Sequence, residues 1–179
     1  MLNMMQTLLD RLDRTVVHWL ARASLPFLRF GMGVVFLWFG ALKFFPGLSP
    51  ATELAVRTID VLTFGLIPGN ISLILLAGLE TLIGLGFLTG RQMRLTLGLL
   101  TFQMAGTLTP LALFPGEAFS LFPFVPTLEG QYIIKNLVLI GAGLVIGATV
   151  RGGRIVAEPG ETAAAGSQLW NQPARVERS

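Results

Sequence analysis

Hydrophobic residues in this chain are concentrated in four long stretches, which are separated by short polar, glycine-rich or proline-rich segments. The stretches cover residues 25–45, 70–90, 95–114 and 131–150. At 1.5 Å per residue, a helix of about 20 residues is about 30 Å long, which matches the hydrocarbon core of a bilayer. The pattern therefore predicts an all-α polytopic membrane protein, with a four-helix transmembrane bundle over residues 25–150.

Within the first stretch, small and basic residues recur at steps of three and four. These are Arg29, Gly33, Phe36, Gly40 and Lys43, which fall on one helix face. Small residues allow a neighbouring backbone to approach closely. We therefore expect this face to pack against other helices. The same role is predicted for Gly86 and Gly90 in the second stretch and for Gly143 and Gly147 in the fourth.

The segments between the spans also carry patterns. In residues 1–24, apolar residues recur at helical spacing, which predicts an amphipathic helix on the membrane surface, with a frayed terminus as the alternative. Pro26 suits the first turn of the span that follows. Residues 46–69 predict a short interfacial or re-entrant helix, which ends at Pro68-Gly69 and carries a Glu53–Arg57 pair at i,i+4. Pro110 is expected to kink or end the third span.

The last two segments are rich in residues that favour loops. Residues 115–130 contain three prolines and three phenylalanines, which predicts an ordered loop packed on the rim of the bundle. Residues 151–179 are polar and rich in Ala, Gly and charge, which predicts a disordered cytoplasmic tail.

The composition excludes several functional classes. The chain has 13% charged residues, whereas a soluble domain has about 25%. It has no cysteine, which excludes disulfides, cysteine-bound zinc and iron–sulfur clusters. His18 is the single histidine, so a haem held by two histidines of this chain is excluded and no metal site is predicted. No catalytic residue is identified, and any redox role would need a diffusible cofactor or a partner.

Basic residues lie mainly beside the apolar stretches, which indicates membrane orientation rather than nucleic-acid binding. With four spans, both termini and the 91–94 turn share one side, and that side carries most of the arginines. The positive-inside rule therefore places both termini in the cytoplasm and the two long loops outside.

Polar residues inside the spans form the candidate site. Glu80 lies deepest, and a charge there requires a proton or a partner. Measured from the cytoplasmic end, Arg29 lies about 6 Å deep, Glu80 about 15 Å, and Lys43 about 12 Å beyond Glu80. We therefore predict an intramembrane cluster of Arg29, Glu80 and Gln103. Lys43, Lys135 and Asn136 are predicted to lie at the external mouth, where the lysines anchor the helix ends.

Two interpretations of this cluster stay open at the level of sequence. A buried ion pair can simply determine which helices pack together. Alternatively, a polar pocket with one titratable carboxylate could hold a quinone-like ring or conduct protons through Glu80.

Four motifs occur in an order that resembles the DoxX-like superfamily of small bacterial membrane proteins. They are LRFGMGVVFLWFGALKFFP at 28–46, GLETLIGLGFL at 78–88, TLTPLALF at 107–114 and IIKNLVLIGAGLVI at 133–146. The chain is most similar to the reactive-chlorine-resistance branch (the YkgB/RclC type). This resemblance implies a bacterial inner-membrane protein linked to oxidative or chlorine stress. Some members of the superfamily are subunits of a thiosulfate:quinone oxidoreductase.

Three functions therefore compete. The first is a quinone-associated membrane subunit of a redox complex, with quinone as the cofactor. The second is a membrane scaffold or partner protein with no site of its own. The third is a small proton-coupled transporter that uses Glu80 and would need a homodimer, because four helices are few for alternating access. The expected partners are the lipid bilayer, a second copy and other membrane or redox subunits.

Overall fold

A computed structural model describes residues 2–45, 47–49 and 52–153. Among these residues, four helical segments are long and apolar enough to cross a membrane: Leu12–Leu42, Gly69–Thr89, Met93–Leu113 and Leu128–Thr149. The predicted all-α, four-span fold is confirmed, and the chain is a multi-pass membrane protein. The predicted tail lies almost entirely outside the described residues.

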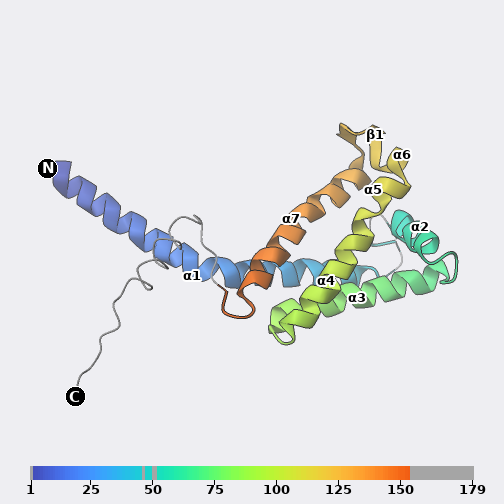
Figure 1. Ribbon diagram of the computed structural model, residues 1–179, viewed down its shortest axis with the longest axis horizontal. Helices are drawn as coiled ribbons and strands as arrows, with labels where there is room; N and C mark the ends of the chain where they lie inside the picture. Colours follow the sequence, from blue (N-terminus) through green and yellow to red (C-terminus); the bar gives the residue numbers. More distant parts are fainter. Residues whose placement is uncertain (1, 46, 50–51, 154–179) are drawn as a thin grey trace, which may run out of the picture.

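The N-terminal segment and the first span form one continuous helix, α1 (Leu2–Leu42), with Pro26 inside it. The predicted break between residues 24 and 25 is therefore wrong, as is the expected position of Pro26 in a first turn. A proline removes one backbone N–H from the helical ladder, and the strong helix-forming residues around it keep the helix intact. The N-terminal half of α1 projects away from the bundle (Figure 1).

The helix predicted within residues 46–69 is α2 (Thr52–Leu62), and Leu54 and Thr58 are its buried residues. It ends before Pro68-Gly69. Pro68 is instead the N-cap of α3 (Gly69–Thr89), since proline lacks the N–H that a first helical turn leaves unpaired. Gly69 lies against α2, because a Cβ atom there would be 2.8 Å from Val56 Cγ1. A helical hairpin therefore occupies this part of the chain.

The third span is divided at Pro110, as predicted, into α4 (Met93–Leu108) and α5 (Pro110–Leu113). The predicted rim loop contains α6 (Pro115–Ala118) and a small antiparallel sheet of β1 (Phe119–Leu121) and β2 (Val125–Pro126). Helix α7 (Leu128–Thr149) follows. Its N-cap is Thr127, whose hydroxyl oxygen accepts a hydrogen bond from the backbone N–H of Gly130 at 3.1 Å.

The core of the bundle lies between α1, α3, α4 and α7 (Figure 1). Each of these helices contributes two buried apolar residues: Met32 and Phe36, Ile83 and Phe87, Leu100 and Met104, and Ala142 and Ile146. Most other large apolar side chains on these helices are exposed in the isolated chain. This distribution is expected for a bundle whose outer surface contacts lipid.

Glycines set the antiparallel register of α1 and α3. A Cβ atom on Gly84 would collide with the backbone of Leu37, and one on Gly33 would lie 2.6 Å from Leu88 Cγ. One on Gly40 would lie 2.8 Å from the backbone nitrogen of Thr81. Each of these contacts brings two backbones together at a position without a side chain. Gly40 therefore lies beside the residue that follows Glu80.

Candidate functional site

Glu80 forms an ion pair with Lys43 in the interior of the bundle. The Lys43 Nζ atom lies 2.6 Å from Glu80 Oε2, and the two side chains are 13% and 10% exposed. A buried charge without a partner is strongly unfavourable, so each group stabilises the charged form of the other. The pair joins the C-terminal end of α1 to the middle of α3.

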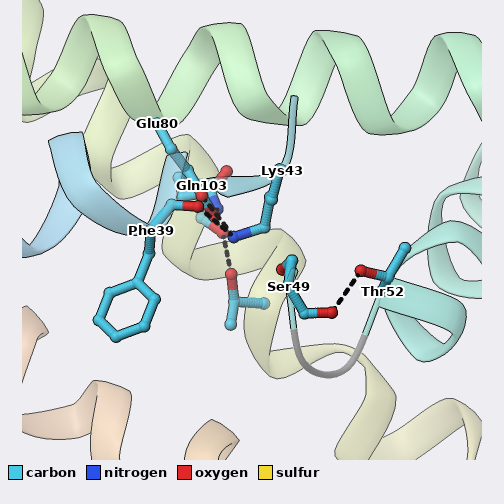
Figure 2. Close-up of polar contacts among 7 residues, drawn as sticks. Phe39, Lys43, Ser49, Thr52, Glu80 and Gln103 are labelled. Atoms are coloured by element: carbon cyan, nitrogen blue, oxygen red, sulfur yellow. Dashed lines mark hydrogen bonds and ion pairs between the residues drawn. The ribbon is translucent and has the colours of Figure 1, made fainter. Parts of the chain in front are cut away.

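Gln103 on α4 completes the cluster (Figure 2). Its Nε2 donates a hydrogen bond of 2.9 Å to Glu80 Oε1, and Gln103 is itself buried. The hydroxyl of Thr107, one turn further along α4, donates to the backbone carbonyl of Gln103 at 2.9 Å. Both carboxylate oxygens of Glu80 therefore have a donor, and three helices contribute to one polar cluster.

The end of α1 positions Lys43. The last turn tightens, because the backbone N–H groups of Lys43 and Phe44 donate to the carbonyls three residues earlier, Gly40 and Ala41. The ammonium also donates to the carbonyl of Phe39 at 3.4 Å, so the lysine side chain runs back along its own helix (Figure 2). A cation at a helix C-terminus also interacts favourably with the helix dipole.

The predicted pairing of Arg29 with Glu80 is wrong. Arg29 lies at the other end of the bundle beside Gly90, where a Cβ atom would be 3.1 Å from Arg29 Nη1. The prediction placed residues 25 and 90 at the same depth, but the structure places Gly40 level with Thr81. At 1.5 Å per residue, this shift of six residues moves Lys43 about 9 Å toward Glu80. A lysine side chain spans the remaining gap of about 3 Å along the helix axis, whereas Arg29 is left about 18 Å away.

The other predicted site residues are not part of the cluster. Lys135 is exposed, and its ammonium lies 5.6 Å from the centroid of the Tyr132 ring, where cation–π attraction applies. Asn136 is half-buried on α7. A Cβ atom on Gly86 or Gly143 would collide with Thr96 or Leu100, so both glycines lie at close helix contacts. Gly147 makes only an ordinary contact with Leu97, at 3.6 Å. Gly90 ends α3 in the left-handed conformation, with φ +67°.

A second group of charges lies at the rim. Arg57 on α2 pairs with Glu117 on α6 rather than with Glu53, and its guanidinium lies 4.7 Å from the centroid of the Phe114 ring. The expected i,i+4 pair is therefore replaced by a contact between two elements. An open cavity of about 650 Å³ lies here, and Glu53, Glu129, Ser49 and Thr52 also line it.

The chemistry available at the Lys43–Glu80–Gln103 cluster is hydrogen bonding and proton transfer. Among the described residues, no group of three His, Cys, Asp or Glu side chains is arranged to hold a metal ion. The sequence analysis selected Glu80 and Gln103 for the cluster but placed Lys43 at the external mouth as a mouth or anchor residue, whereas the structure pairs Lys43 with Glu80. The sequence feature that could have placed Lys43 in the cluster is the helical face that it shares with Gly40, since that face packs against α3. Protein-family models, curated proteins and solved structures were compared with this chain, and none matches it.

Proposed function

We propose that this protein is the membrane subunit of a quinone-linked redox complex. The observation that supports the proposal best is the Lys43–Glu80–Gln103 cluster, in which an ammonium, a carboxylate and an amide meet inside an apolar bundle. The motif order that resembles the DoxX-like superfamily supports a bacterial inner-membrane location and a role in oxidative or chlorine stress. The arginine-rich 91–94 turn supports cytoplasmic termini.

The cluster has the hydrogen-bonding capacity that a quinone ring requires. The bonds to Glu80 and Phe39 use two of the three N–H groups of Lys43, so the third can donate to a ligand carbonyl. Each oxygen of Glu80 can accept a second bond, and the carboxylate can hold a proton close to that ligand. A bound quinone would supply the electron-transfer chemistry that a chain without cysteine lacks. The remaining exposure of both side chains leaves a route to them.

The test measures quinone in the protein as purified from a native membrane. Mass spectrometry of an organic extract is expected to find quinone at a near-stoichiometric level. A short-chain ubiquinone analogue is expected to quench tryptophan fluorescence in a saturable manner. Glu80→Gln should lower the affinity for the analogue at least about tenfold, because the loss of one charge-assisted hydrogen bond is worth about 1.5–3 kcal/mol.

Lys135→Gln is the matched control, because it removes an exposed lysine that does not contact the cluster. It should leave the affinity for the analogue unchanged. The proposal fails if the wild type contains no quinone and has no affinity for the analogue. It also fails if Glu80→Gln binds as tightly as the wild type.

A second candidate function is that of a membrane scaffold with no ligand. It is favoured by the way the three polar groups satisfy one another while joining α1, α3 and α4. Replacing Lys43 and Glu80 together by Met and Leu separates the two functions. A folded double variant that retains the stress-resistance phenotype of the wild type would assign the cluster to packing.

A further inference from the structure

A crevice lies at the end of the bundle opposite to the Lys43–Glu80–Gln103 cluster. Its volume is about 320 Å³, and it opens between α1, the turn that joins α3 to α4, and the end of α7, which passes beside α1 (Figure 1). The walls are mostly apolar, with Arg29 and Thr149 as the polar side chains among Leu25, Met93, Ile146 and Val150. Amphiphilic lining of this kind suits a ligand with one charged and one apolar part.

Arg29 is positioned by the absence of a side chain at Gly90. The Cβ atom of any other residue there would be 3.1 Å from Nη1 and 3.2 Å from Cζ of the guanidinium. Gly90 also has a φ of +67°, which glycine adopts without strain. The two ion pairs formed by the described residues are Lys43–Glu80 and Arg57–Glu117, so neither involves Arg29.

The charge around the crevice is positive. Arg91 and Arg94 lie in the adjoining turn and Arg151 follows α7, and all three are exposed. Residues 14–52, 81–116 and 130–153 contain no Asp or Glu, so none of the described segments that form this end of the bundle carries an acidic side chain. The C-terminal ends of α3 and α7 contribute about half a negative charge each, which is less than the charge of four arginines. A net positive potential therefore remains at the crevice.

The crevice also lies at the depth of lipid phosphates. Spans α3 and α7 end at Thr89 and Thr149, and α4 begins at Met93, so this level marks one edge of the hydrocarbon core. Basic pockets between transmembrane helices at this level recognise anionic headgroups. Guanidinium binds phosphate through paired N–H groups, which an ammonium cannot reproduce.

We propose that this crevice is a binding site for an anionic glycerophospholipid. Arg29 donates two N–H groups to the phosphate, and the apolar walls contact the first part of an acyl chain. The exposed arginines contribute a favourable potential but no defined contact. The site does not depend on the function proposed above, because Arg29 and Lys43 are 14 residues, or about 21 Å, apart along α1.

The test uses the full-length protein, delipidated in a neutral detergent. Bound lipid is counted by native mass spectrometry during titration with short-chain phosphatidylglycerol, phosphatidylcholine or inorganic phosphate. We expect saturable binding of phosphatidylglycerol. Phosphatidylcholine should bind at least about tenfold more weakly, because the positive potential around the crevice repels its trimethylammonium group. Inorganic phosphate should also bind at least about tenfold more weakly, because it lacks the acyl chain that contacts the apolar walls. Arg29→Gln should lower phosphatidylglycerol affinity by about the same factor, because it removes both donors to the phosphate.

Arg94→Gln is the matched control, since it removes one exposed arginine that does not line the crevice. The affinity of Arg94→Gln for phosphatidylglycerol should stay within about twofold of the wild-type value, because salt screens the charge of an exposed side chain at the rim. Arg29→Lys keeps the charge without the paired donors, so it should bind phosphatidylglycerol more weakly than the wild type. This second variant keeps the proposal testable if Arg29→Gln fails to fold.

Three results would overturn the proposal. Equal affinity for phosphatidylglycerol and phosphatidylcholine would show that the crevice does not distinguish an anionic headgroup from a zwitterionic one. Equal affinity for inorganic phosphate would show a free-anion site. Wild-type affinity in both Arg29 variants would show that the guanidinium does not bind the lipid.

Discussion

Replacing Lys43 by Met tests the assignment of the Glu80 partner most directly. The change removes the ammonium that lies 2.6 Å from Glu80 Oε2 and leaves a carboxylate in a side-chain environment that is only 10% exposed. Breaking a buried ion pair at one partner typically destabilises by about 3–5 kcal/mol. Hydrogen bonds between transmembrane helices contribute about 0.6 kcal/mol on average, so the unpaired charge dominates the expected effect.

The full comparison is a double-mutant cycle of Lys43→Met with Glu80→Leu. The double variant removes both charges and replaces them by apolar groups of similar volume, so its stability should lie close to the wild-type value. The coupling between the two changes should therefore be at least as large as the cost of the single change, about 3–5 kcal/mol, which is above the usual range for residues in contact. Equilibrium unfolding by sodium dodecyl sulfate in mixed micelles, followed by far-UV circular dichroism, measures each free energy of unfolding.

Arg29→Met is the control that distinguishes the Lys43–Glu80 pair of the structure from the Arg29–Glu80 pair predicted from the sequence. Arg29 is exposed and lies beside Gly90, so its removal should change stability by less than about 0.5 kcal/mol and show no coupling to Glu80. Strong coupling between Arg29 and Glu80, with additive effects at Lys43, would refute the assignment of Lys43 as the partner.

Three further predictions concern packing, the rim and orientation. Gly84→Ala should destabilise by about 1–3 kcal/mol in the same unfolding assay, because its Cβ atom meets the Leu37 backbone, whereas Gly78→Ala has open space and should not destabilise. Arg57→Gln should lower stability by less than about 1 kcal/mol, since the ion pair with Glu117 is exposed; a larger loss would show that this contact is desolvated. Because the chain lacks cysteine, Phe64→Cys and Gln92→Cys each introduce a single thiol. An impermeant maleimide added to intact cells should label only the thiol at position 64, and the reverse result would invert the proposed orientation.

The number of spans and most of their boundaries were predictable, because a segment that crosses the hydrocarbon core must be apolar over a fixed length, and that property can be read directly from the sequence. A stretch of about 20 apolar residues must satisfy its backbone hydrogen bonds internally, which makes it helical. The third span could be divided correctly because Pro110 lacks the N–H that a continuous helix requires. Pro26 has the same chemistry but lies within an unbroken helix. Proline therefore weakens a helix locally, while the residues around it decide whether the helix ends.

The pairing inside the site was not predictable from depth, because depth depends on where each helix enters the membrane. An error of six residues in the register of α1 against α3 corresponds to about 9 Å, which is enough to exchange one cationic partner for another. The contacts that determine the true register are those of Gly33, Gly40 and Gly84. A glycine can be identified as a packing position in a sequence, but the backbone that it faces cannot. The register therefore becomes known only from the folded bundle.

The position of the cluster follows from the way α3 packs against two different helices, α1 along its second half and α2 at its start. The second half of α3 packs on α1, through Gly84 against Leu37 and Leu88 against Gly33. The first residue of α3 packs on α2, through Gly69 against Val56. Glu80 lies near the point along α3 where α1 ends, and beyond that point α2 is the helix packed against α3. A helix end at this depth leaves backbone carbonyl groups without partners and carries the negative end of the helix dipole. The Lys43 ammonium donates a hydrogen bond to one of these carbonyls, that of Phe39, and its charge interacts favourably with the dipole. The same ammonium also donates to the Glu80 carboxylate. The charged pair is therefore stabilised by the point at which α1 stops, so lengthening α1 by a turn should disrupt the cluster even with all three side chains retained.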